Sequence, residues 1–158
     1  MGTRAVVITV SDGVSAGTRQ DSSGDALEAM LDDAGYEVAR GLVPDDADRI
    51  SAAILDACAR ASLVLTTGGT GFGVRDVTPE ATDAILEREA PGLVHVMLAE
   101  GLTKTPMAAL TRAKAGTIGG CLVVNLPGSP KGAAESLAAI IGLIPHALQL
   151  LGGDNRHH

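Results

Sequence analysis

The stretch from residue 64 to residue 81 constrains the fold more than any other part of this 158-residue chain. It reads VLTTGGTGFGVRDVTPEA, in which an apolar run gives way to four glycines within six residues, then to Asp76 and the helix start TPE. A strand, a glycine loop and a helix in this order commonly hold a phosphate, because glycines let backbone N–H groups approach an anion and the helix N-terminus adds positive partial charge. The stretch therefore predicts a polyanion site.

Neither of two common phosphate-loop motifs is present in this stretch. Gly68 and Gly73 have the spacing of a Walker A loop, but Val74 stands where that motif requires Lys. The segment Gly69-Thr70-Gly71 opens the dinucleotide pattern, but Val74 also occupies the place of its third glycine. The residues of this loop do not identify its ligand. The alternative to a ligand site is a turn that only joins a strand to a helix. The density of Thr, Gly and Asp favours a ligand site.

The composition favours helices packed on a sheet. Apolar residues make up 46% of the chain, but Tyr36 and Phe72 are its only aromatic residues, so the core must consist of Ala, Val, Leu and Ile. A strand-rich sandwich would normally use more aromatic side chains, whereas an α/β layer structure suits this composition. The length suits a single domain, residues 1–158, with a flexible tail expected at 153–158.

The charge and the apolar segments limit the expected partners. The net charge is −7 and there is no run of Lys or Arg, which argues against a nucleic-acid polymer but is compatible with a small anion and a divalent cation. The longest apolar stretch, 136–151, is interrupted by Pro145 and His146 and is too short to span a bilayer. Cys58 and Cys121 lack CxxC spacing and are predicted to be buried, reduced thiols. We therefore expect a cytoplasmic protein without a membrane partner.

Apolar, β-branched runs alternate with helical patterns along the chain. The predicted strands are residues 4–10, 36–43, 62–66, 115–118 and 121–126. The predicted helices are residues 24–34, a segment opened by Pro44-Asp45-Asp46, residues 79–89 and 93–102, a short segment near 108–112, and a long last helix after residue 132. This alternation predicts a three-layer α/β sandwich, with a mostly parallel sheet and helices on both faces. Gly119-Gly120 signals a tight turn and hence a small antiparallel element.

Three polar loops leave the carboxyl ends of predicted strands, where ligands bind in such sheets. They are Ser11-Asp12-Gly13, the glycine loop at 68–76, and residues 127–132. In the last loop Lys131 is a candidate point charge for a phosphate, the alternative being a solvated lysine beside a helix start. No GxSxG elbow or Ser-His-Asp arrangement accompanies Ser129, which argues against a nucleophile there.

Asp45 and Asp76 each precede a predicted helix. Beside an N–H-rich loop they are candidate ligands for Mg²⁺, which takes few protein carboxylates and completes its octahedron with water and substrate phosphates. For Asp45 the alternative is a helix N-cap, with Asp48 completing a capping-box-like pair. Thr78 is expected to cap the helix after the glycine loop, which leaves Asp76 free in that loop. The alternative for Asp76 is a turn residue.

Six segments, taken in order, resemble one known family. They are VSDG (10–13), DSSG (21–24), LVPDD (42–46), TTGGTG (66–71), RDVTPEA (75–81) and NLPGSPKGA (125–133). The chain is similar to the molybdenum-cofactor biosynthesis proteins of the MogA/MoaB type, whose domain gephyrin also carries. The resemblance spans nearly the whole chain, and TTGGTG followed by DVTPE and NLPGSPKG is a specific combination.

This resemblance implies a molybdopterin adenylyltransferase, which transfers AMP from Mg-ATP to the terminal phosphate of molybdopterin and releases pyrophosphate. It implies that Asp45 and Asp76 are catalytic, which is compatible with their candidacy as ligands of Mg²⁺. It also implies a homotrimer, or a hexamer, with a molybdenum-insertion protein as a further partner. The expected substrate- and nucleotide-binding residues are Ser11, Asp12, Thr67, Gly68, Gly69, Thr70, Gly71, Thr78, Pro79, Glu80, Ser129 and Lys131. The alternatives are a catalytically silent molybdopterin-binding or scaffold protein, and a small-molecule sensor that binds an unrelated nucleotide.

Overall fold

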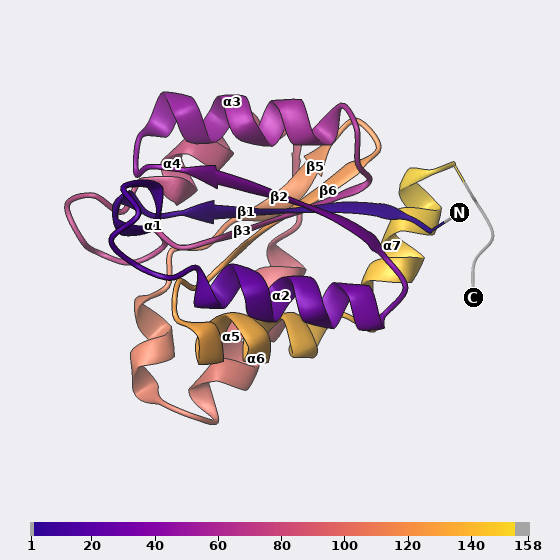
Figure 1. Ribbon diagram of the computed structural model, residues 1–158. Helices are drawn as coiled ribbons and strands as arrows, with labels where there is room; N and C mark the ends of the chain where they lie inside the picture. Colours follow the sequence, from indigo (N-terminus) through magenta and orange to yellow (C-terminus); the bar gives the residue numbers. More distant parts are fainter. Residues whose placement is uncertain (1, 154–158) are drawn as a thin grey trace.

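A twisted sheet runs through the middle of the molecule (Figure 1). The computed structural model describes residues 2–153, and within them six strands have the order β2-β1-β3-β6-β5-β4. Strands β1, β2, β3 and β6 are parallel, whereas β5 is antiparallel to both β6 and β4. The strand bounds are β1 Arg4–Val10, β2 Glu37–Val43, β3 Leu63–Thr67, β4 Arg88–Glu89, β5 Ala115–Ile118 and β6 Cys121–Leu126. The prediction of a mostly parallel sheet with a small antiparallel element is confirmed.

Helices cover both faces of the sheet. Helices α3 and α4 lie on one face, and α2, α5 and α6 lie on the other (Figure 1). Their bounds are α1 Asp12–Ser15, α2 Ser22–Asp33, α3 Ala47–Cys58, α4 Thr78–Asp83, α5 Pro91–Leu102, the 3₁₀ helix η1 Pro106–Leu110, α6 Pro130–Ile140 and α7 Ile144–Leu151. The three-layer prediction is therefore confirmed. The tail predicted at 153–158 falls, apart from Gly153, outside the described residues.

The central strands contain long apolar runs because each strand contributes side chains to two hydrophobic cores, one on each face of the sheet. In β1, Ala5 and Val7 pack with α2, α5, α6 and α7, while Val6, Ile8 and Val10 pack with α3 and α4. Successive side chains of a strand point to opposite faces, so a strand covered on both sides is mostly apolar. The exceptions in β1, β3 and β6 are buried residues toward the carboxyl ends, Thr9, Thr66, Thr67 and Asn125. The two cysteines are free, and their side chains lie in or against the core on the α3 side.

Two helix predictions are wrong, and tertiary contacts explain both. The helix expected over 79–89 ends at Asp83, because the following residues pair with β5: the Glu87 N–H donates to the Thr117 carbonyl oxygen at 2.9 Å, and Arg88–Glu89 form β4. The long last helix is two helices, α6 and α7, bent by 63°. Pro145 lacks the N–H that a continuous helix needs and its ring opposes the preceding turn.

No single helix among the described residues has the length and apolar character of a membrane span. The bent pair α6 and α7 has this length and apolar character only when the two helices are taken together.

The parallel strands end at one edge of the sheet. Thr9 of β1 lies beside Thr67 of β3, and Thr67 in turn lies beside Leu126 of β6. The loops that follow β1, β2, β3 and β6 therefore leave the sheet together. This edge carries the candidate functional site.

Candidate functional site

A cavity of about 450 Å³ lies at the carboxyl edge of the sheet, between the loops that follow four parallel strands. Its lining includes the two predicted catalytic residues, Asp45 and Asp76, together with Asp21 from the start of α2. We call this cavity the acid cleft. Of the other predicted site residues, the acid cleft is lined by Ser11, Thr67, Gly68, Gly69 and Ser129. The convergence of separate loops on both carboxylates agrees with the sequence-based expectation.

Asp45 is fixed to the loop after β1 by a reciprocal pair of hydrogen bonds. The Asp12 N–H donates to the Asp45 carboxylate at 3.0 Å, and the Asp45 N–H donates to the Asp12 carboxylate at 3.0 Å. The N-cap of α3 is the neighbouring Asp46, whose carboxylate accepts the Arg49 N–H at 3.1 Å. The alternative role of Asp45 as a helix cap is therefore wrong, and its carboxylate belongs to the cleft.

Arg75 completes this arrangement from the glycine loop. Its guanidinium donates from Nε and Nη2 to the two oxygens of Asp12, at 2.9 and 3.0 Å. These bonds, followed by the Asp45 N–H, hold the pKa of Asp12 below its ordinary value. Burial raises the pKa of Asp45, and the charges of Asp12 and Asp76 add to this increase. Asp45 is thus a carboxylate that a cation in the acid cleft would stabilise.

The glycine loop turns sharply where β3 ends. Gly68 and Gly69 have φ values of +106° and +70°, which side chains other than glycine rarely adopt. A Cβ at Gly68 would overlap the carbonyl oxygen of Val10, so the loop also packs directly on β1. The N–H groups of Gly69 and Gly71 donate to no acceptor within residues 2–153, and they are available to an anion.

Two predictions about the helix after this loop need correction. Thr78 does not cap α4, because the helix begins at Thr78 and its flanking residue Val77 makes no side-chain cap. The Thr78 hydroxyl donates instead to the Gly68 carbonyl oxygen at 2.9 Å, which ties the helix to the loop. Asp76 is not free: its carboxylate accepts the Gly73 N–H at 2.8 Å. Asp76 is therefore a turn residue that also lines the acid cleft.

Arg112 holds the glycine loop from outside, a role that sequence reasoning missed. Its guanidinium donates to the carbonyl oxygens of Gly71 and Asp76, at 2.7 and 2.8 Å, and to the Glu80 carboxylate at 2.6 Å. The guanidinium carbon lies 5.8 Å from the centre of the Phe72 ring. These contacts join positions that are far apart in sequence. No local motif carries them, and only the general tendency of Arg to bind several oxygens could have drawn attention to Arg112.

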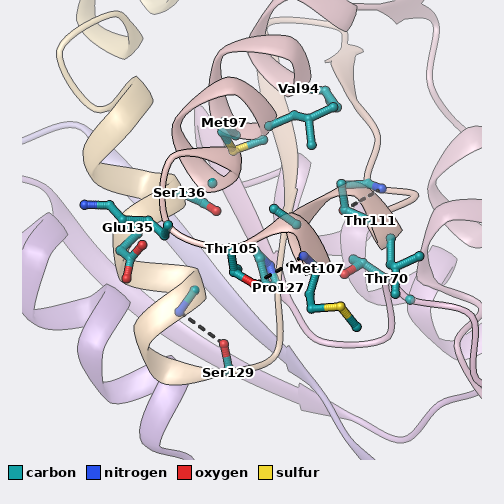
Figure 2. Close-up of a pocket in the computed structure, with 18 of the residues that line it drawn as sticks. Thr70, Val94, Met97, Thr105, Met107, Thr111, Pro127, Ser129, Glu135 and Ser136 are labelled. Atoms are coloured by element: carbon teal, nitrogen blue, oxygen red, sulfur yellow. Dashed lines mark hydrogen bonds between the residues drawn. The ribbon is translucent and has the colours of Figure 1, made fainter.

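A second cavity of about 330 Å³ adjoins the acid cleft and has a mostly apolar lining (Figure 2). We call it the apolar cavity. Met97 of α5 and Met107 of η1 line it, and Thr70 and Gly71 of the glycine loop form another part of its wall. Ser129 lines both cavities, while its hydroxyl accepts the Gly132 N–H at 3.1 Å as the N-cap of α6.

The remaining predicted site residues line neither cavity. Asp12 positions Asp45, Thr78 holds Gly68, and Pro79 is buried in the first turn of α4. The carboxylate of Glu80 is committed to Arg112, which lowers its pKa. Lys131 is exposed in the first turn of α6. The structure therefore brings together the glycine loop, two predicted acids and Ser129, but not Glu80 or Lys131.

A mostly parallel sheet, with a glycine loop and carboxylates gathered at its carboxyl edge, defines an α/β protein with a site suited to a small charged ligand. Within this class, the chain belongs to the family described as "Probable molybdopterin binding domain", which matches residues 6–146. This membership agrees with the resemblance seen in the sequence.

Curated relatives match nearly the whole chain. The molybdopterin adenylyltransferase of Helicobacter pylori strain 26695 is 36% identical over 153 residues, which cover 94% of this chain and 87% of that protein. The molybdenum cofactor synthesis protein cinnamon of Drosophila melanogaster is 41% identical over 94% of this chain. The chain spans only 25% of cinnamon.

Solved structures share the fold. The molybdopterin biosynthesis enzyme MoaB of Thermus thermophilus is 49% identical, with a TM-score of 0.88 over 96% of this chain and 97% of that one. A MogA structure is 34% identical, with a TM-score of 0.90 over 94% and 99% of the two chains. These similarities confirm the predicted fold.

Proposed function

We propose that this protein is a molybdopterin adenylyltransferase, which transfers AMP from Mg-ATP to the terminal phosphate of molybdopterin and releases pyrophosphate. The family membership and the adenylyltransferases of Helicobacter pylori and Escherichia coli, each 36% identical over most of both chains, support this activity. The observation that carries the proposal is the convergence of Asp45 and Asp76 on one cleft beside the glycine loop.

The chemistry needs positioning more than proton transfer. A phosphate oxygen of molybdopterin attacks the α-phosphorus of ATP, a new P–O bond forms, and the bond to the β-phosphate breaks as pyrophosphate leaves with the electron pair. A phosphate monoester has a second pKa of about 6 and is largely ionised at neutral pH, so no strong general base is required. The lining of the acid cleft agrees with this, because within residues 2–153 it includes carboxylates and no histidine.

Asp45 and Asp76 are the residues that would hold Mg²⁺. No group of three or more His, Cys, Asp or Glu positioned for a metal occurs in the described part of the chain. Magnesium needs only one or two protein carboxylates when substrate phosphates supply the other ligands, and the raised pKa of Asp45 fits a carboxylate that gains from a nearby cation. Bound there, the metal would neutralise charge on the phosphates as pyrophosphate departs.

The two adjoining cavities suit the two kinds of group that the substrates carry. The free N–H groups of the glycine loop suit a phosphate. The apolar cavity beside them suits a flat ring system, which buries apolar surface against side chains such as Met97 and Met107. Ser129 lies where the two would meet.

Turnover by the purified protein tests the proposal. With Mg-ATP and fresh molybdopterin, the wild type should release pyrophosphate and form an AMP–pterin product separable by chromatography. Asp76→Asn should slow this step by about 100-fold or more, the scale of losing a preorganised electrostatic group. Asp33→Asn is the matched control. Asp33 is exposed at the end of α2, just before β2 begins, and so lies away from the carboxyl ends of the strands. Tight pterin binding without turnover in the wild type would instead identify a carrier or scaffold.

We also propose, from the family likeness, a cytoplasmic homotrimer that passes its product to a molybdenum-insertion protein. Phe72, Val74 and Met107 expose 69%, 99% and 64% of their surface, and such apolar side chains near the site suit protein contacts. Light scattering after gel filtration should give three times the 15.9 kDa mass of one chain. A hexamer would double that value, and a monomer would contradict the proposal.

A further inference from the structure

We propose that Arg19 binds a phosphate group of a substrate in the acid cleft, an inference that rests on the proposed function and adds a residue to it. Arg19 lies in the loop between α1 and α2, is exposed, and lines the acid cleft. Within residues 2–153 it is the one Lys or Arg in that lining, which also contains three carboxylates. A polyphosphate entering this cleft meets like charge from the acids, and a cation in the wall offsets that repulsion.

The hydrogen bonds of the neighbouring arginines single out Arg19. Arg75 donates from two nitrogens to Asp12. Arg40 is bound to three carboxylates of the α2 region, and Arg112 is bound to the glycine loop and Glu80. The guanidinium of Arg19 has no hydrogen bond or ion pair with any residue in the described range. Its planar donors are therefore available, and a guanidinium binds phosphate oxygens two at a time.

The backbone of α1 is shaped around the Arg19 side chain. A Cβ at Gly13 would lie 2.6 Å from Cδ and 3.0 Å from Cγ of Arg19, so the aliphatic part of Arg19 crosses this glycine closely. Thr18 secures the same contact, because its N–H and its hydroxyl both donate to the Gly13 carbonyl oxygen, at 2.9 and 3.0 Å. Glycine at position 13 thus leaves room for Arg19 beside the acid cleft.

Calorimetry with inorganic pyrophosphate and Mg²⁺ tests this role without turnover. Arg19→Ala should weaken pyrophosphate binding about 10-fold or more, as expected for lost hydrogen bonds between charged groups, and Arg19→Lys should weaken it less. Gly13→Ala should also weaken binding, because it displaces the Arg19 side chain and keeps its charge. Arg60→Ala is the control: it removes one exposed arginine paired with Asp56, outside the acid cleft, and should bind like the wild type.

Steady-state kinetics identify which substrate carries the phosphate. A raised KM for ATP in Arg19→Ala places the ATP phosphates against Arg19, and a raised KM for molybdopterin places the pterin phosphate there; both support the inference. A wild type that shows no turnover but binds pyrophosphate more tightly than Arg19→Ala would refute the proposed activity. The same result would still support the phosphate site at Arg19. The inference is overturned if Arg19→Ala matches Arg60→Ala in pyrophosphate affinity and both KM values, or if the wild type binds neither pyrophosphate nor ATP.

Discussion

Replacement of Gly68 by alanine tests how the glycine loop is held against the sheet. The added Cβ meets two separate obstacles. At a φ of +106°, a side chain strains the backbone, which costs about 1–2 kcal/mol. The same Cβ overlaps the Val10 carbonyl oxygen, which belongs to a central strand and cannot rotate away. Forcing such a shift costs about 1–3 kcal/mol more.

The free energy of unfolding of Gly68→Ala should therefore fall by about 2–5 kcal/mol, a large part of the roughly 5–15 kcal/mol typical of a folded domain. The melting temperature should fall by about 4–20 °C for a domain of this size. Urea titrations followed by far-ultraviolet circular dichroism measure this loss, since the chain has no tryptophan.

Two other glycines separate strain from overlap. Gly35 has a φ of +94°, but a Cβ added there would have no atom within 4 Å, so Gly35→Ala should show the strain alone. Gly142 has neither a positive φ nor an atom within 4 Å of an added Cβ, and Gly142→Ala should be neutral or stabilising by about 0.4–1 kcal/mol. If Gly68→Ala loses no more stability than Gly35→Ala, the argument from direct packing on Val10 is refuted.

Three further outcomes are expected. Arg112→Lys keeps the charge but loses the fork that reaches two loop carbonyls, so urea titration should show a loss of about 1–3 kcal/mol together with slower turnover; wild-type stability would contradict this. Asp45→Asn should lower kcat about 100-fold. It should also raise the melting temperature at pH 7, because the pKa of Asp45 is raised and the folded protein disfavours its charged form. A lowered melting temperature would contradict the raised pKa. The pKa of Asp12 is lower in the folded protein than its ordinary value of 3.8. Its stabilising effect is therefore complete above pH 3.8 and is lost as the pH falls through the lower folded value. The melting temperature of Asp12→Asn should differ from that of the wild type at pH 7, and the two should converge as the pH falls below 3.8.

The parts of the fold that depend on burial were predictable from the sequence. Strands covered on both faces are mostly apolar, with buried polar residues such as Thr66 and Asn125 only toward their carboxyl ends. The helices between them show one apolar stripe, so the layers followed directly. The two-residue strand β4 was not predictable, because it forms only where Arg88–Glu89 meet β5. The break between α6 and α7 had a visible cause in Pro145, but the apolar pattern continues across it.

The candidate site shows a similar division. Asp45 and Asp76 could be named because acids beside a glycine loop are chemically distinctive, and the structure places both in the acid cleft. Which of two adjacent aspartates caps α3 could not be decided from composition, since Asp45 and Asp46 differ only in the direction their side chains take. The contacts of Arg112 are with main-chain oxygens, which every residue has, so no residue pattern marks them.

The way Arg112 fastens the glycine loop has a consequence for how this protein can evolve. Its bonds to the loop use peptide oxygens, and these persist when a side chain is exchanged. Val74 at the loop tip, 99% exposed, makes no contribution to that fastening. Mutation can therefore reshape the outer rim of the loop, and with it the molecules that dock there, while the inner wall keeps its geometry.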